Sequence, residues 1–440
     1  MASKGLMIAG LASGSGKTMI TLGLLRALAR RGKAPAAGKT GPDYIDSGFL
    51  SAAAGRKAVN LDQIAMSKPL LARLAADQAG DTLIIEGVMG LFDGASGNAG
   101  SSAALAEALD IPVILVMDIR HTAQTAAMIA AGIASLLPAG RIAGVILNHV
   151  ASPRHLALVS EALAAHQISL FGSVPSRDGL AVPSRHLGLV QAADFDNAGV
   201  EQILDHAADL IDEYCDLDAI LDAAQGLPAA GKAVAALPLP VTNPQAQNPP
   251  AKTIAVANDA AFGFAYHHLL AGWQQQGAEI RPFSPLNDEK PADDADFIFL
   301  PGGYPELHLP TLSRNRQFLV GLNKAATANI PIYGECGGYM VLGTGITDAS
   351  GNRFDMAGLL DVETSFANKK RHLGYRKFTP VEPFFWDGPF LGHEFHYTNV
   401  VSASGTPLFT AHDANDQPLG MAGLRKGSVA GSYLHIIAQS

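Results

Sequence analysis

The first half of the chain alternates short apolar runs with longer stretches in which apolar residues recur at helical spacing. The runs are predicted strands, at residues 5–9, 34–39, 82–86, 112–117, 143–147 and 169–174, and most are separated by helical patterns such as 17–31 and 103–109. Near-continuous apolar strands in a βαβ rhythm are typical of a parallel sheet covered on both faces. The pattern therefore predicts a doubly wound α/β fold for this half.

A change of composition divides the chain. Residues 226–252 are rich in Pro, Ala, Gln and Asn and contain Pro-Leu-Pro and Asn-Pro-Pro, which indicates a linker. A second α/β series follows, with apolar runs that include 253–257 and 330–333. We predict two α/β domains, residues 1–225 and 253–440, joined by this linker.

Length and charge narrow the functional classes. A chain of 440 residues is long enough for about two or three domains. Its formal net charge of −9 argues against nonspecific binding of nucleic acid, which needs a basic surface. Cys215 and Cys336 indicate no disulfide framework, and no apolar run approaches the roughly 18 residues of a membrane span. We expect a cytoplasmic protein without nucleic-acid or membrane partners, and we leave a homodimer open.

A glycine-rich segment, Gly10-Leu-Ala-Ser-Gly-Ser-Gly-Lys-Thr, follows the first predicted strand and opens a helix. Backbone amides of such a loop bind phosphate, and we assign Gly14, Ser15 and Gly16 to this role. Lys17 would reach the β- and γ-phosphates of a bound nucleotide, and the Thr18 hydroxyl would bind Mg²⁺. Five residues, not four, separate the outer glycines of the loop, which points away from ordinary GTPases. The alternative is a turn that only starts a helix.

Acidic residues after two of the strands are candidates for binding the metal. Glu86 ends a strand at the carboxyl edge of the sheet, where α/β proteins place ligands, and Asp43 follows another strand. We predict that both bind Mg²⁺. The alternative for each Asp is a turn or cap residue, and for Asp46 and Asp93 the two hypotheses stay open.

Two further polar residues end strands of the same half. Lys39 is a candidate for holding the γ-phosphate or a substrate carboxylate. Asn148 would contact the adenine edge, with a capping role as the alternative.

Cys336 lies in Ile-Pro-Ile-Tyr-Gly-Glu-Cys-Gly-Gly-Tyr-Met, an apolar run that breaks at a cysteine between glycines. This pattern indicates a nucleophile at a strand-to-helix elbow, with Gly334 and Gly337 allowing the strained turn. The amides of Gly337 and Gly303 would form an oxyanion hole, and His435, at the end of a predicted strand, would be the base. The alternative is a cysteine that only fills the core.

These motifs carry a family resemblance. Pro-Gly-Gly at 301–303, Gly-Glu-Cys-Gly-Gly at 334–338 and Ser-Tyr-Leu-His at 432–435 are similar to class I glutamine amidotransferase domains. The N-terminal half is similar to dethiobiotin synthetase, whose phosphate loop shares the lengthened spacing. This resemblance implies a P-loop domain followed by an α/β class I glutaminase domain.

The whole chain resembles the cobyrinic acid a,c-diamide synthases, called hydrogenobyrinic acid a,c-diamide synthases in the aerobic route. The matching motifs lie at residues 41–46, 86–94, 185–189, 301–306 and 392–397. The resemblance implies that the Cys–His pair releases ammonia from glutamine. It also implies that ATP and Mg²⁺ serve to activate the a and c acetates of a corrinoid polycarboxylate as acyl phosphates, which ammonia converts to amides.

One position departs from the usual triad glutaminases. They have a Glu two residues after the histidine, whereas Ile437 stands there in this chain. The resemblance then implies a Cys–His site without that acid, as in the cobyrinate subgroup. His435 must be oriented by a group that the sequence does not identify.

Other functions stay open at this point. Cobyric acid synthase is a longer relative that amidates other side chains, and a nickel-tetrapyrrole a,c-diamide synthase shares much of the signature. A partitioning-type ATPase switch belongs to a different class, but it usually carries an additional lysine near the start of the loop, where Ser13 and Gly14 stand. The motifs do not distinguish a cobalt-free from a cobalt-containing substrate.

Overall fold

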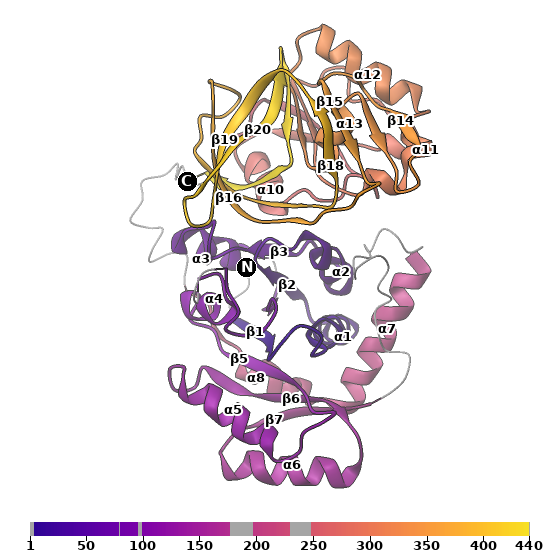
Figure 1. Cartoon of the computed structure of the whole chain (residues 1–440). Helices are drawn as coiled ribbons and strands as arrows, with labels where there is room; N and C mark the ends of the chain where they lie inside the picture. The colour runs from indigo at the N-terminus through magenta and orange to yellow at the C-terminus, as the bar shows by residue number, and fades with distance from the viewer. Residues whose placement is uncertain (1–3, 79, 96–98, 177–196, 229–247, 440) are drawn as a thin grey trace. The chain divides into compact units, whose positions relative to one another are not determined.

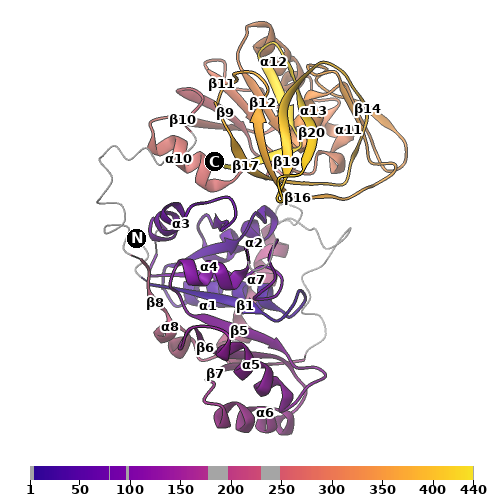
Figure 2. The ribbon, with the colours of Figure 1, turned by 60° about the vertical axis from the view of Figure 1, so that its left-hand side comes forward.

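The computed structural model describes residues 4–78, 80–95, 99–176, 197–228 and 248–439, and the chain divides into two units, residues 1–241 and 242–440 (Figure 1, Figure 2). Most of the predicted linker falls outside the described residues, so the domain boundaries stay a prediction. Its first residue, Gly226, lies in β8 (Gln225–Gly226), which pairs antiparallel with β1 (Lys4–Gly10). Strand β8 therefore extends one residue into the predicted linker.

An eight-stranded sheet forms the first unit. Apart from β8, its strands run parallel in the order β3 (Val59–Leu61), β2 (Pro35–Thr40), β4 (Thr82–Glu86), β1, β5 (Val113–Asp118), β6 (Ile142–Val150) and β7 (Leu170–Pro175). Every strand predicted for this half is confirmed. The short β3 was missed because three residues do not make a recognisable apolar run.

Helices lie on both sides of this sheet in Figure 1. To the right are α1 (Lys17–Arg30), α2 (Tyr44–Ala54) and α7 (Asn197–Tyr214), and to the left are α3 (Lys68–Ala76), α4 (Ser102–Ala108) and α5 (Thr125–Ser135). The unit also contains α6 (Pro153–Ala165) and α8 (Leu217–Ala223). Leu6 and Ile8 of β1 share one buried cluster with Leu204 of α7, whereas Met7 between them is buried on the opposite face. Burial on both faces explains why the strands are apolar at every position.

A ten-stranded sheet forms most of the second unit. Its parallel strands are, in order, β10 (Glu279–Phe283), β9 (Thr253–Ala257), β11 (Phe297–Leu300), β12 (Ile332–Glu335) and β21 (Val429–Ser432). An antiparallel part continues with β20 (Pro418–Lys426), β19 (Thr406–Asp413), β16 (His372–Pro380), β17 (Phe390–His396) and β22 (Leu434–Gln439). The sequence did not predict the antiparallel part, because strands such as β16 and β20 are mostly half-buried or exposed and carry no apolar run.

A smaller four-stranded sheet, in the order β14 (Arg353–Asp355), β13 (Gly345–Thr347), β15 (Val362–Ser365) and β18 (Asn399–Ala403), belongs to the same unit. The helical segments of the second unit are α10 (His267–Gln275), α11 (Leu309–Leu312), α12 (Arg316–Thr327), α13 (Gly337–Leu342) and the 3₁₀ turns η2 (Pro285–Asn287) and η3 (Pro305–Leu307). Ile298 and Leu300 of β11 join one buried cluster, and Phe297 and Phe299 join another. The parallel strands are thus covered on both faces, as predicted for an α/β domain.

Candidate active sites

The phosphate loop lies between β1 and α1, as predicted. Gly14 has a φ of 80° and Gly16 a φ of 93°, a conformation that other residues rarely adopt, so these glycines are needed for the turn. Lys17 is the first residue of α1, and its Nζ donates a hydrogen bond to the carbonyl of Ala12 at 3.1 Å. Burial lowers the pKa of Lys17, and the attraction of Glu86 opposes this shift. The loop therefore keeps its lysine buried against its own backbone.

Polar residues from neighbouring strands meet at the carboxyl edge of the sheet. Glu86 at the end of β4 is in register with Ile8 of β1 and with Lys39 of β2. Its Oε1 accepts a hydrogen bond from the Thr18 hydroxyl at 2.5 Å and lies 3.2 Å from Nζ of Lys39. The Lys39 amine also binds Asp46 at 2.6 Å. Thr18, Lys39, Asp46 and Glu86 thus form one charged cluster beside the loop.

Burial controls the charges of this cluster, since the exposed fractions of Lys39 and Glu86 are 2% and 0%. Burial would lower the pKa of Lys39, but the attraction of Glu86 and Asp46 outweighs it and raises that pKa. Oε2 of Glu86 and Oγ of Ser15 are buried without a hydrogen-bond partner in the described part of the chain. Buried oxygens without partners are costly, and oxygen is the ligand that Mg²⁺ prefers. The residues present therefore fit a metal–phosphate ligand at this edge.

Asp43 and Asn148 both have structural contacts. Oδ1 of Asp43 caps α2 by accepting hydrogen bonds from two backbone amides at 3.0 and 3.1 Å, and burial raises the pKa of Asp43 to about 7. Nδ2 of Asn148 donates to the carbonyl of Ser15 at 3.0 Å, and a methyl group on Gly16 would lie 2.2 Å from that nitrogen. The capping alternative for Asp43 is thus observed, and Asn148 supports the loop. Their metal and adenine contacts stay predictions.

Cys336 forms the predicted elbow between β12 and α13. Its φ of 47° and ψ of −105° are strained for a residue with a side chain. From the sequence, the strained turn is expected at Gly334 and Gly337. In the structure the strand continues through Glu335 and the helix starts at Gly337, so the strained torsion angles are those of Cys336 itself. Gly334 is needed for space rather than for its torsion, since a methyl group there would lie 2.8 Å from the carbonyl carbon of Gly338.

The structure brings the predicted glutaminase residues together around closely packed glycines. A methyl group on Gly302 would lie 2.3 Å from Cε1 of His435 and 3.2 Å from Cβ of Cys336. A methyl group on Gly337 would lie 3.1 Å from the amide nitrogen of Gly303, so the two predicted oxyanion donors are neighbours. Burial raises the pKa of the Cys336 thiol, while a hydrogen bond from the Gly337 backbone opposes the shift.

The prediction that His435 ends a strand is wrong. The chain leaves β21 at Tyr433 and returns as β22, so that His435 is the second residue of a new strand, opposite His393 of β17. The break was not recognised because apolar residues continue on both sides of it. This turn places His435 close to β12 and its nucleophile.

Glu335, which sequence reasoning missed, is the acid beside His435. Its Oε2 lies 3.6 Å from Nδ1 of His435, and its Oε1 accepts a hydrogen bond from the Ile436 amide at 3.1 Å. Burial raises the pKa of Glu335 to about 8. Burial, together with His393 and His396, lowers the pKa of His435 to about 3. Both side chains are therefore neutral and buried. Glu335 is the acid beside the histidine here, whereas Ile437 stands at the position of the usual acid.

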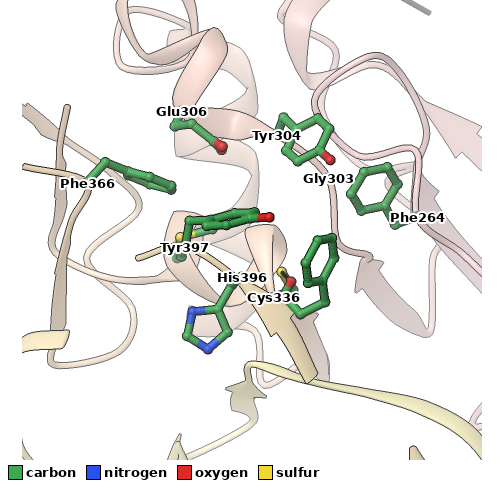
Figure 3. A pocket seen from close by; sticks show the side chains of 10 residues that line it. Phe264, Gly303, Tyr304, Glu306, Cys336, Phe366, His396 and Tyr397 are labelled. Atoms are coloured by element: carbon green, nitrogen blue, oxygen red, sulfur yellow. Dashed lines mark hydrogen bonds between the residues drawn. The ribbon is translucent and has the colours of Figure 1, made fainter. Parts of the chain in front are cut away.

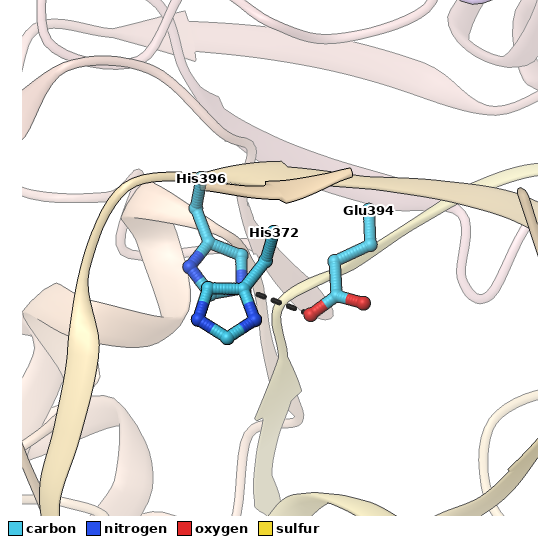
Figure 4. A group of neighbouring side chains, drawn as sticks. All are labelled: His372, Glu394 and His396. Atoms are coloured by element: carbon cyan, nitrogen blue, oxygen red, sulfur yellow. Dashed lines mark hydrogen bonds and ion pairs between the residues drawn. The ribbon is translucent and has the colours of Figure 1, made fainter. Parts of the chain in front are cut away.

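His372, Glu394 and His396 form a polar cluster in the second unit (Figure 4). Nε2 of His396 lies 2.9 Å from Oε1 of Glu394, and Nδ1 lies 3.2 Å from the carbonyl of Thr398. Arg376 donates to Oε2 of Glu394 at 2.7 Å. These residue types bind metals in other proteins. We assign no metal here, because both oxygens of Glu394 and both ring nitrogens of His396 already have protein partners.

Known protein families match both halves of the chain. A CobQ/CobB/MinD/ParA nucleotide binding domain matches residues 6–190, and a CobB/CobQ-like glutamine amidotransferase domain matches residues 253–440. The chain is 48% identical over 436 residues to a hydrogenobyrinate a,c-diamide synthase of Rhizobium meliloti (strain 1021), covering 98% of this chain and 99% of the relative. The protein belongs to the hydrogenobyrinate a,c-diamide synthase family.

Two further members of the hydrogenobyrinate a,c-diamide synthase family show the same full-length match. A relative from Brucella abortus biovar 1 (strain 9-941) is 47% identical over 438 residues, covering 99% of this chain and 98% of its own. One from Rhodobacter capsulatus is 44% identical over 443 residues, covering 99% of both chains. The resemblance seen in the motifs is thus confirmed, although the motif at 185–189 lies outside the described residues. Within those residues, no helix is long and apolar enough to cross a membrane.

The packing around Gly302 predicts a selective defect. Gly302→Ala should lower kcat/KM for glutamine hydrolysis by about 100-fold, because the added methyl group would displace His435 or Cys336 from its position. Gly272→Ala is the matched control, since a methyl group on Gly272 would meet no atom within 4 Å. Steady-state release of glutamate measures both variants. Equal activity of the two would contradict the close packing of Gly302 against the Cys–His pair.

Proposed function

We propose that this protein is an ATP- and glutamine-dependent ligase that converts the a and c acetate carboxylates of hydrogenobyrinate to amides. The full-length similarity to relatives named for this activity, 48% identical over 436 residues in one case, carries the proposal. The phosphate loop and the Cys–His pair supply the two chemistries that such a reaction needs. A homodimer and a cytoplasmic location stay predictions from the sequence.

The N-terminal half would bind the nucleotide. Lys17 would exchange its hydrogen bond with the Ala12 carbonyl for the β- and γ-phosphates of ATP. The backbone amides of Gly14, Ser15 and Gly16 would contact the same phosphates.

The charged cluster beside the loop would hold the metal and the substrate. We infer Mg²⁺ ligands at Thr18 and Glu86, with Asp43 as a further candidate, because the Glu86 oxygen that lacks a partner is available for a cation. Bound there, Mg²⁺ would neutralise charge on the phosphates. Lys39 stays charged at neutral pH and is the candidate to hold the γ-phosphate or the substrate carboxylate.

The ligase step follows from the weakness of a carboxylate as an electrophile. An oxygen of the carboxylate attacks the γ-phosphorus of ATP, the bond to the β-phosphate oxygen breaks, and ADP leaves. Ammonia then attacks the carbonyl carbon of the acyl phosphate. Inorganic phosphate leaves, ammonia gives up a proton, and an amide remains.

The C-terminal half would supply the ammonia. Sγ of Cys336 attacks the side-chain amide carbon of glutamine, while His435 takes the thiol proton and passes it to the leaving nitrogen. The amides of Gly303 and Gly337 would stabilise the negative oxygen of the tetrahedral intermediate. Ammonia departs, and water hydrolyses the thioester to glutamate and free thiol.

Glu335 would position His435 for this proton transfer. When Glu335 is ionised, Nδ1–H of His435 can donate to it, and Nε2 is left free to accept the proton of Cys336. When Glu335 is protonated, its hydroxyl group can donate to Nδ1 and so favour the wrong tautomer. The ionised form is therefore the active one.

Substitutions in the two halves should have separable effects. Cys336→Ala removes the nucleophile and should lower glutamine-dependent synthesis by about 10³-fold or more, while synthesis from added ammonium remains. Lys17→Ala should lower synthesis from both nitrogen sources, by about 10²- to 10³-fold. Amide formation by mass spectrometry measures both. Loss of ammonium-dependent synthesis in Cys336→Ala would contradict separate roles for the halves.

The pH profile tests Glu335. Because the pKa of Glu335 in the free protein is raised to about 8, kcat/KM for glutamine hydrolysis should increase as the pH rises through 8. Glu335→Gln should lower kcat by roughly 10- to 100-fold with little change in KM, since general-base catalysis as a whole contributes about 10²- to 10⁴-fold. The variant should also lose the rise near this pH. A rise that persists unchanged, with exposed Glu279→Gln as the control, would rule out the positioning role.

Substrate choice decides among the related ligases. With ATP, Mg²⁺ and glutamine, we expect turnover of hydrogenobyrinate to an a,c-diamide, and comparison with cobyrinate measures the preference for a cobalt-free ring. Product mapping by mass spectrometry and NMR identifies the amidated positions. Amides at other side chains would favour a cobyric acid synthase-like enzyme, and turnover only of a nickel tetrapyrrole would favour the methanogen-type relative.

A further inference from the structure

A small pocket opens beside the nucleophile in the second unit (Figure 3). Cys336 and Gly303 are among the lining residues. A molecule bound in the pocket would therefore contact the nucleophilic residue and one predicted oxyanion donor. The walls are mainly aromatic and are formed by Phe264, Tyr304, Phe366 and Tyr397. Glu306 is the one carboxylate among the lining residues, so it is the residue that can give the pocket a carboxylate charge.

Glu306 has no ion-pair partner among the residues that the structure describes. It lies in η3, immediately after Pro-Gly-Gly-Tyr-Pro, and its Oε2 is buried without a hydrogen-bond partner in the described part of the chain. Burial raises the pKa of Glu306 to about 7, and a hydrogen bond from its own backbone amide and the charge of Lys369 only partly oppose this shift. No described ion pair or hydrogen bond joins Lys369 to it. A buried, unpaired carboxylate is costly unless a cation arrives to pair with it.

The Glu306 carboxylate lies in the same pocket as the nucleophile. Figure 3 shows the carboxyl group of Glu306 directed into the pocket, with Cys336 across from it. Its charge is the second contribution, after burial, to the raised pKa of the Cys336 thiol, so the two groups are within electrostatic reach. A glutamine molecule whose amide carbon reaches the sulfur must place its α-ammonium group elsewhere in the same pocket. Glu306 is the lining residue with the charge to receive that group.

We propose that Glu306 binds the α-ammonium group of glutamine and thereby selects the free amino acid over other primary amides. The inference rests on the proposed function, because it assumes that the Cys336 pocket hydrolyses glutamine. It adds a substrate-binding residue that is separate from the nucleophile, the base and the oxyanion donors. Binding would also remove the unpaired charge from the pocket, since the ammonium group supplies the missing partner.

The test compares glutamine with 4-carbamoylbutanoate, which is glutamine without its α-amino group. The unaltered protein should prefer glutamine by about 100-fold or more in kcat/KM, since a buried group left unpaired discriminates strongly. Glu306→Gln should lose most of this preference, through a higher KM for glutamine, while kcat/KM for 4-carbamoylbutanoate changes by less than about threefold. Exposed Glu279→Gln is the matched control and should keep the preference. Ammonia release from each amide provides the rates.

The outcomes separate this inference from the proposed function. If the unaltered protein releases no ammonia from glutamine, the proposed glutaminase function itself fails. If it does and Glu306→Gln retains the full preference for glutamine, only the role of Glu306 is refuted. Equal loss on both amides would show that Glu306 acts in the chemistry or the fold, which also overturns the inference. Thermal melting separates these two cases, because removing an unpaired buried charge should not lower the melting temperature.

Discussion

Parallel strands end at a common edge of their sheet, and this constraint positions both candidate sites. In the first unit it gathers Lys39 and Glu86 beside the loop that follows β1, although these residues are far apart in the sequence. In the second unit β12 delivers Cys336 to the edge, next to β21. The chain then turns back into β22 and brings His435 to the same place. The chemistry of each site depends on strand order before it depends on any single side chain.

Burial determines how these groups can act. In the first unit opposite charges compensate one another, so Lys39 stays charged although it is almost completely excluded from solvent. In the second unit Glu335 and Glu306 lack such charged partners, and their pKa values are raised to about 8 and about 7. Groups of this kind respond strongly to a bound ligand or to a proton. The free protein thus holds Glu335 and His435 in a neutral state, whereas Glu306 titrates close to neutral pH and can carry a charge that a bound cation would stabilise.

Much of this organisation could be predicted from the sequence, because it follows from local patterns. Apolar runs gave the parallel strands, and glycine spacing gave the phosphate loop and the elbow at Cys336. Features that depend on contacts between distant segments could not be predicted from the sequence. The break at Tyr433 is hidden by continuing apolar residues, and the proximity of Glu335 to His435 arises from the packing of β12 against the strands that follow. Asp43 carries both a capping and a metal-binding pattern; the structure shows the cap, and metal binding stays a prediction.

The central claim is that glutamine hydrolysis at Cys336 provides the nitrogen for amides formed through an acyl phosphate at the phosphate loop. One measurement follows both the amide nitrogen of glutamine and the carboxylate oxygen that would be transferred to phosphate. The protein is supplied with glutamine labelled with ¹⁵N in the side-chain amide and with hydrogenobyrinate labelled with ¹⁸O in its carboxylates, in the presence of ATP and Mg²⁺. The account predicts ¹⁵N in each new amide and one ¹⁸O atom transferred to inorganic phosphate for each amide formed. Amide formation without ¹⁸O in the phosphate, or without ¹⁵N in the product, would contradict it.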